Sequence, residues 1–208
     1  MHPIERLRYV ARAQGVPGDV LAAEATAALM TFSEDPAALV AGCRRVLSRQ
    51  VGCGQLWWAC ARLLTSERVH EAARATIEAL EGDTTGAALS LSLDLDPDSD
   101  AVQPIVVDAH AIGDGGAIVD AYAAEDLDAP FDDDHAPQRW LVAGVGVQLS
   151  APMWGSLVEH WSAEPRSGED LVPLDRFTHF VGPDGPLPLV ALGEPDCPVA
   201  PELFRLVG

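Results

Sequence analysis

The sequence predicts an α/β fold in which an N-terminal helical domain precedes a reduced Rossmann-like, mostly parallel sheet. Two observations support this prediction. Apolar residues recur at three- and four-residue spacing through residues 2–82, as they do in amphipathic helices. From Ile105 onward the apolar residues instead form short runs that end at small residues, most clearly in Ile105–Tyr122 and Trp140–Gly146. Such runs are typical of buried strands in α/β sheets.

Caps and breaks divide the first domain into five predicted helices. Gly15–Gly18 breaks the first helix, Asp19 is expected to cap the second, and Ser33–Asp35 the third. Gly82 ends the last helix. The predicted helices are 3–14, 20–32, 36–49, 55–64 and 66–80.

Residues 83–104 are predicted to form an acidic linker, and residues 105–208 the reduced Rossmann-like domain. Strands are expected at 105–108, 117–120, 140–145 and 177–181, helices at 152–161 and 201–206, and a loop at 125–138. Only about twenty residues separate Asp83 from Ile105, whereas one βαβ unit needs about thirty. The sheet should therefore be small, with an edge that needs cover.

Charge is distributed unevenly along the 208 residues, whose net charge is −19. All 13 basic residues are Arg, so a Schiff-base lysine and a phosphate-loop lysine are excluded. Residues 1–74 hold nine Arg and seven acidic residues, while residues 75–138 hold sixteen acidic residues and no base. This anionic stretch repels nucleic acid and anionic membranes. We therefore predict neither nucleic acid nor a membrane as a partner.

The chain is expected to be cytoplasmic, because it begins without the pattern of a secretory signal and contains no apolar run long enough to span a membrane. The four cysteines, Cys43, Cys53, Cys60 and Cys197, are then expected to be reduced and mostly buried. Alternating Asp residues at 94–100 are similar to a calcium loop but lack its sixth-position Gly and twelfth-position Glu. We predict no metal and no cofactor.

The candidate catalytic residues are Asp108 and His110, which follow the first predicted strand. A carboxylate there can orient the imidazole for proton transfer, and Asp114 is a further carboxylate of this group. The alternative is structural, since Asp114-Gly115-Gly116 is also a hairpin signal.

Other residues at the expected strand ends are candidate ligand contacts. In open α/β sheets, ligands bind outside the carboxyl ends of the strands. The predicted ligand-binding residues are Asp114, Gly115, Gly116, Asp120, Arg139 and Gly144. For the glycines, the alternative is again a turn that directs the chain away from the sheet.

Three segments then indicate a family by their order and spacing. IVVDAHAIGDGGAIVDAY, RWLVAGVG and PLDRFTHFVGPDGPLP together resemble the C-terminal domain of the alpha/beta/delta-type subunits of initiation factor 2B. That family includes ribose-1,5-bisphosphate isomerase and methylthioribose-1-phosphate isomerase. The resemblance covers residues 105–192 by motif and the first third by architecture, and the whole chain is also similar to actinobacterial members. It implies a homodimer, because the C-terminal domains of the family associate with one another.

The resemblance also shows where this chain departs from the isomerases. His110 falls where they carry a catalytic Asp, and Asp120 and Ala121 fall where they carry a substrate-binding Asn-Lys pair. The region of their catalytic Cys has no counterpart here. We therefore expect a degenerate, non-catalytic protein with a regulatory or interaction role and a vestigial pocket for a phosphorylated sugar or nucleotide.

Two alternatives stay open. One is an active sugar-phosphate isomerase whose acid/base chemistry has moved to Asp108 and His110, with Arg139 facing a bound anion. The other is a binding module whose arginine-bearing helices, with Arg44, Arg45 and Arg49, dock an acidic partner.

Overall fold

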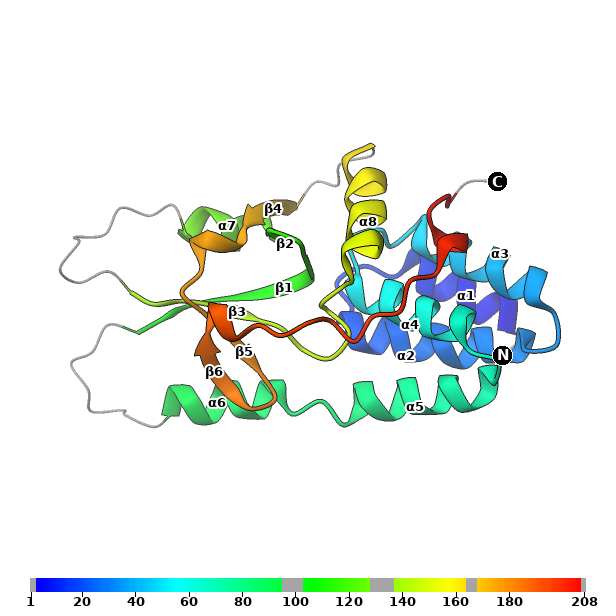
Figure 1. The fold of residues 1–208 in the computed structure, drawn as a ribbon, viewed down its shortest axis with the longest axis horizontal. Coiled ribbons are helices and arrows are strands. Elements are labelled where there is room, and N and C mark those ends of the chain that lie inside the picture. Colours follow the sequence, from blue (N-terminus) through cyan, green and yellow to red (C-terminus); the bar gives the residue numbers. More distant parts are fainter. Residues whose placement is uncertain (1–2, 95–102, 128–136, 164–167, 207–208) are drawn as a thin grey trace.

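The computed structural model describes residues 3–94, 103–127, 137–163 and 168–206, and it confirms the predicted α/β fold. The helices of the first part gather at one end of an elongated molecule and the sheet lies at the other (Figure 1). No helix within these four ranges is long and apolar enough to cross a membrane.

The five predicted N-terminal helices are present. They are α1 (Pro3–Arg12), α2 (Gly18–Leu29), α3 (Pro36–Leu47), α4 (Gly54–Thr65) and α5 (Val69–Glu81), with a short 3-10 turn, η1 (Met30–Phe32), after α2. Asp35 caps α3 as predicted, because its Oδ1 accepts a hydrogen bond from the Ala38 N–H at 3.0 Å. The prediction for Asp19 was wrong: α2 begins at Gly18, two residues before the predicted start, with Pro17 at the N-cap, and Asp19 lies in its first turn. Its negative charge there still interacts favourably with the positive end of the helix dipole.

The sheet has a parallel centre and antiparallel flanks. Its strand order is β4-β2-β1-β3-β5-β6. The strands are β1 (Ile105–Gly113), β2 (Gly116–Asp120), β3 (Arg139–Val142), β4 (Glu169–Pro173), β5 (His179–Gly182) and β6 (Gly185–Pro188). β3 pairs in parallel with β1 and β5, whereas β2, β4 and β6 pair antiparallel. Both edge strands carry prolines, which lack the N–H that another strand would need.

Two helices on the sheet lie where the sequence indicated a linker or a loop. α6 (Thr85–Asp94) packs against β5 and β6, and α7 (Ala121–Leu127) against β1, β2 and β4. Figure 1 shows α6 below the sheet and α7 above it. Residues 95–102 of the predicted acidic linker and residues 128–136 of the predicted loop are outside the described ranges.

The C-terminal part returns to the helices. After α8 (Ala151–Ala163) and two 3-10 turns, η3 (Leu174–Arg176) and η4 (Leu189–Ala191), the chain runs back along the helical end to η5 (Pro201–Leu203) (Figure 1). The prediction of a helix at 201–206 was wrong in length: the structure has only this 3-10 turn, and residues 205–206 are not helical.

Two apolar cores follow from this path. The larger joins the N-terminal helices to α8 and the C-terminal tail, through Trp57, Leu157 and Leu203, and it includes Ala111 and Ile118 from the sheet. The smaller lies between the sheet and α7. The predicted boundary at residue 105 separates helices from strands in the sequence. The larger apolar core, however, contains residues from both sides of this boundary.

Candidate functional site

The loop after β3 meets the helical part at the carboxyl ends of the parallel strands. The Val145 N–H donates a hydrogen bond to Asp83 Oδ2 at 2.7 Å, and the Val145 carbonyl accepts one from Gln55 Nε2 at 3.0 Å. Gly146 packs on the Trp58 ring so closely that a Cβ there would lie 2.6 Å from it. Ligands of α/β proteins usually bind at such strand ends, but here side chains of the same molecule occupy the position.

Asp83 connects this loop to α6. Its Oδ1 accepts hydrogen bonds from the Thr85 N–H at 2.9 Å and the Thr85 hydroxyl at 2.6 Å. Gly144, one of the predicted ligand contacts, lies against the same carboxylate, because a Cβ at Gly144 would be 2.6 Å from Asp83 Oδ2. The structure thus gives Gly144 a contact within the chain. The sequence Asp83-Thr84-Thr85 is typical of a helix start, and this pattern could have indicated a structural role for Asp83.

His110, the predicted catalytic imidazole, lies in a bulge of β1. The pairing with β2 shifts between Ala109 and Ala111, which leaves His110 as the extra residue. Its Nδ1 lies 3.7 Å from Glu169 Oε1, and the two side chains are 39% and 19% exposed. The carboxylate partner of His110 thus comes from β4, although the sequence indicated the neighbouring Asp108.

Glu169 is held in place from two sides. Its Oε2 accepts a hydrogen bond from Trp161 Nε1 of α8 at 2.7 Å. The carboxylate also lies against the backbone before α4, where a Cβ on Gly52 would be 2.5 Å from Oε2. A fixed carboxylate beside a half-exposed imidazole has the composition of an acid/base pair. Because 59 residues separate Glu169 from His110 in sequence, no local pattern indicates their contact.

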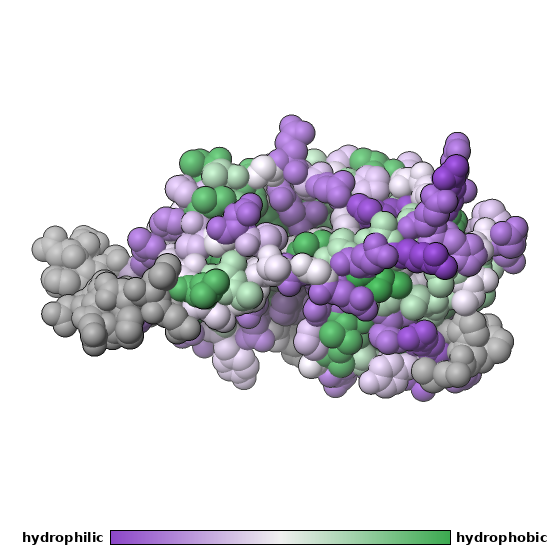
Figure 2. All heavy atoms as spheres, turned by 90° about the horizontal axis from the view of Figure 1, so that it is seen from below, coloured by the Kyte–Doolittle hydropathy of each residue, from purple (hydrophilic) through white to green (hydrophobic). Residues whose placement is uncertain are grey.

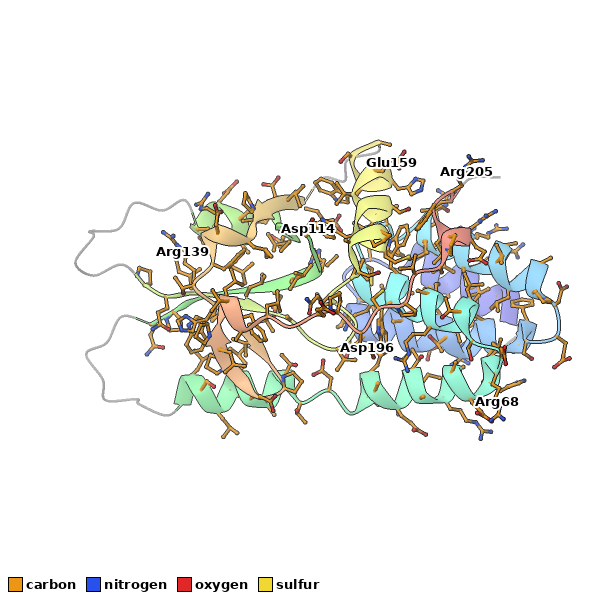
Figure 3. All side chains as sticks on the ribbon, in the orientation of Figure 1. Arg68, Asp114, Arg139, Glu159, Asp196 and Arg205 are labelled. Carbon is orange, nitrogen blue, oxygen red and sulfur yellow. The ribbon has the colours of Figure 1, made fainter. Side chains whose placement is uncertain are left out.

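Asp108 lies in β1, opposite Val142 of β3, and is exposed. Arg139 lies at the other end of β3, opposite Ile105. Figure 3 shows Arg139 and Asp114 at opposite ends of the sheet. The arginine that the isomerase alternative needs near the acid/base residues is therefore not brought to them.

The segment Asp114-Gly115-Gly116 forms the hairpin turn between β1 and β2. Gly115 has φ +78°, a backbone conformation that glycine adopts without strain. Its carbonyl accepts a hydrogen bond from the Leu174 N–H at 3.0 Å. The turn also packs on α8, since a Cβ on Gly113 would be only 2.0 Å from the Trp154 side chain.

Asp120 begins α7. Its Oδ1 accepts a hydrogen bond from the Tyr122 N–H at 2.9 Å, as a helix-capping carboxylate does. The position that resembles the isomerases' substrate-binding Asn therefore holds a helix start here.

Three of the cysteines have thiol pKa values above the usual value. Burial raises the pKa of Cys53 to about 12, and the charge of Glu169 acts in the same direction. The hydrogen bond with Cys43, together with burial, raises the pKa of Cys60 well above its usual value, and burial raises that of Cys197. A thiol is nucleophilic as the thiolate, so these groups are inert at neutral pH. All four cysteines are free, and three are buried.

Two open hollows lie on the outer surface near α4 and α5. One, of about 440 Å³, is lined by Arg62 and Asp196, whose side chains form an ion pair at 3.0 Å. The Arg62 guanidinium also lies 4.8 Å from the Trp58 ring centre. Across the described part of the chain, no three His, Cys, Asp or Glu side chains are placed to hold a metal ion.

Comparison with known proteins identifies solved structures with a similar fold. No family model matches the sequence, and no curated protein does. Among solved structures, eIF2B beta from Chaetomium thermophilum matches with a TM-score of 0.62, over 92% of this chain and 89% of that chain, at 12% identity. A chain of the tetrameric eIF2B-beta2-delta2 complex from the same organism matches with a TM-score of 0.64, over 92% of each chain, at 13% identity. The chain has an eIF2B-like fold.

This eIF2B-like fold includes both parts of the molecule, because the matches cover nine-tenths of the chain. The fold implied by the sequence resemblance is confirmed. At 12–13% identity the likeness establishes the fold alone, and a fold does not fix a function.

Proposed function

We propose that this chain is a non-catalytic, cytoplasmic protein of eIF2B-like fold that acts as a regulatory or interaction module. The main support is that side chains fill the space between the loop after β3 and the helices, which we call the junction. There Val145 is hydrogen-bonded to Asp83 and Gln55, and Gly146 contacts Trp58. A substrate of an α/β protein would bind at this place.

Electrostatics supports the same proposal. A sugar phosphate at the junction would meet the carboxylates of Asp83 and Glu169, and like charges repel at short range. Arg139 lies at the far end of β3 and the chain has no Lys. A vestigial pocket for a phosphorylated ligand would have to centre on the half-exposed His110.

Turnover assays test the catalytic part of the proposal. The full chain is incubated with ribose-1,5-bisphosphate and with methylthioribose-1-phosphate, and the ketose products are measured. We expect no product above the uncatalysed rate. Product formation that is lost in His110→Ala, and also in Asp108→Ala or Glu169→Gln, would contradict the proposal.

A thermal-shift series tests the vestigial pocket separately. A ligand that binds only the folded chain raises Tm. With the same two sugar phosphates and with nucleotides, we expect a small rise that His110→Ala removes. If Tm does not change with these compounds, the pocket part of the proposal is wrong and the interaction role is unaffected.

The proposed partner in the simplest assembly is a second copy. One of the structural neighbours is a subunit of a tetrameric complex, and the sequence resemblance implies pairing through the C-terminal half. Sedimentation velocity on the full chain is the direct measurement, and a monomer at every concentration would exclude the homodimer.

One observation favours a second candidate function, an active isomerase with relocated acid/base residues. The distance of 3.7 Å between His110 Nδ1 and Glu169 Oε1 is compatible with a pair that closes further on a ligand. This candidate predicts that Glu169→Gln lowers kcat strongly, whereas Asp108→Ala has little effect.

A further inference from the structure

The two edges of the sheet differ in what their outer sides offer to another strand. Within the described residues, β4 and β6 each have a neighbouring strand on one side only. In an antiparallel pair, every second residue directs its N–H and C=O toward the partner strand, and the residues between direct these groups outward. The hydrogen bonds at the ends of β4 and β6 therefore show which backbone groups face outward.

The outer side of β6 has no N–H groups. The Leu189 N–H donates a hydrogen bond to the Thr178 carbonyl at 3.1 Å, so Leu187, two residues earlier, also directs its backbone groups toward β5. The residues that face outward are therefore Pro186 and Pro188, and proline has no N–H. α6 also packs against this strand. A further strand cannot pair fully with this edge.

The outer side of β4 keeps its hydrogen-bonding groups. The Ala121 N–H donates to the Gly168 carbonyl, and the Leu174 N–H donates to the Gly115 carbonyl, both at 3.0 Å. These two bonds continue the pairing of β4 with β2 at either end. Residues 168, 170, 172 and 174 therefore face β2, and residues 169, 171 and 173 face outward.

Leu171 lies at the centre of this outer edge. Its N–H and C=O both face outward, and Pro173 adds a further outward carbonyl. The Leu171 side chain is 41% exposed. It lies on the face of the sheet that α8 covers, since a Cβ on Gly116 would be 3.1 Å from Leu171 and 3.4 Å from the Trp154 ring of α8. The edge therefore combines free backbone groups with an exposed apolar side chain.

Asp170 lies on the opposite face of the same edge. Val172, two residues later, belongs to the smaller core between the sheet and α7, and side chains two residues apart in a strand project from the same face. Asp170 is exposed. Within the described residues, no hydrogen bond or ion pair engages its carboxylate. The α7 side of the edge thus presents an unpaired negative charge.

The surroundings of Asp170 are acidic. α7 contacts both β2 and β4, and Figure 1 shows it beside β4. These three elements contain no basic residue, and their acidic residues are Asp120, Glu125, Asp126, Glu169 and Asp170. The net charge of the chain is −19. Local and overall charge therefore both attract a basic partner.

Figure 2 shows the molecule from below, the side on which α6 lies, and apolar residues there form separate spots among hydrophilic ones. That face presents no broad apolar surface for a partner. Strand addition does not need one, because main-chain hydrogen bonds supply affinity and alternate side chains supply specificity.

We propose that the outer edge of β4 binds an extended basic segment of a partner protein as an added antiparallel strand. Opposite residues of antiparallel strands project from the same face. The residue opposite Leu171 is then apolar and is hydrogen-bonded to it, whereas the residue opposite Asp170 is an arginine or a lysine. A second copy is a poor occupant, because two molecules of net charge −19 repel each other. The inference rests on the proposed interaction role and names the chemistry of the partner.

Fluorescence anisotropy with three labelled peptides tests the strand addition at about 50 mM NaCl, where screening is weak. Each peptide has about eight residues in which arginine and valine alternate, enough to span the edge. One is unmodified, one is N-methylated at the valines and one at the arginines. The valine N–H groups face β4 in the proposed register. We therefore expect the valine-methylated peptide to bind at least about tenfold more weakly than the other two.

Two variants of the full chain test the charge. The test variant is Asp170→Lys, and the control is Glu78→Lys, which has the same net charge and replaces an exposed acidic residue of α5. We expect Asp170→Lys to bind the unmodified peptide about tenfold more weakly, and Glu78→Lys to bind it like the wild type. If Asp170→Lys does not fold, Asp170→Asn tests the same carboxylate.

Several outcomes would overturn the inference. These are no binding to the wild type, equal binding of the two methylated peptides, and an equal loss in both variants. A homodimer that dissociates in Leu171→Pro, which lacks the outward N–H of the edge, would show that a second copy occupies the edge instead. The isomerase assay does not depend on this edge, so failure of the inference and failure of the proposed function are distinguishable.

Discussion

Gly115 and Gly146 have almost the same backbone conformation but different surroundings. Their φ angles are +78° and +77°, which cost a residue with a Cβ about 1–2 kcal/mol. A Cβ on Gly115 would meet nothing within 4 Å, whereas one on Gly146 would lie 2.6 Å from the Trp58 ring. Alanine variants at the two positions therefore distinguish the cost of backbone strain, which both share, from the cost of close packing on Trp58, which only Gly146 has.

We predict that Gly146→Ala destabilises the fold by about 2–5 kcal/mol, the sum of backbone strain and overpacking. Gly115→Ala is the matched control and should cost only about 1–2 kcal/mol. Urea unfolding followed by tryptophan fluorescence measures both. Equal losses would mean that the loop moves away from Trp58 easily and that the junction is not tightly filled.

Cys53 predicts an alkaline loss of stability. Because its pKa rises from about 9 to about 12 on folding, the folded chain keeps a proton that the unfolded chain releases, and stability falls as the pH rises through this window. The loss is at most about 1.4 kcal/mol per pH unit. Denaturant unfolding at about pH 8 and about pH 10 should show a smaller loss for Cys53→Ala than for the wild type. An identical loss in both chains would exclude Cys53 as its source.

At the residue scale, the sequence indicated which residues lie at strand ends and turns better than it indicated which side chains contact each other. The hairpin glycines and His110 were predicted at the end of β1, and the structure places a real turn and a bulge there. Glu169 was missed because only the pairing of β4 with β2 brings it to His110. Asp83 was counted with the acidic linker, although its two oxygens hold both α6 and the loop after β3.

At the scale of elements, the five N-terminal helices were predictable because apolar residues recur at helical spacing and glycine, proline or capping residues separate the helices. α6 was not, since its sequence TGAALSLSLD mixes small and apolar residues without a polar face. β4 and β6 were missed because β4 ends in Pro173 and β6 contains Pro186 and Pro188, and prolines argue against a strand. The edge position of these strands makes such prolines acceptable.

The C-terminal tail is the element whose role the sequence revealed least. Leu203 of η5 is fully buried in the larger core, whereas the next residue, Phe204, is 37% exposed. We predict that Leu203→Ala costs about 2–5 kcal/mol, as for a buried leucine. Phe204→Ala, the control, should cost clearly less. Chemical denaturation of both variants gives the comparison, and a small loss for Leu203→Ala would show that the tail is not an integral part of the core.

At the scale of the whole molecule, charge opposes any association of identical copies. The chain has a net charge of −19, and residues 75–138 hold sixteen acidic residues and no base. Salt screens the repulsion between two such copies. A homodimer should therefore become tighter as salt is added.

We accordingly predict that the homodimer strengthens as NaCl is raised from about 50 to about 500 mM, with Kd falling about tenfold, or about 1.4 kcal/mol. Sedimentation velocity at fixed protein concentration measures the dimer fraction in each buffer. If the dimer instead dissociates as salt is added, opposite charges hold it together, and the repulsion expected from the net charge does not govern the contact.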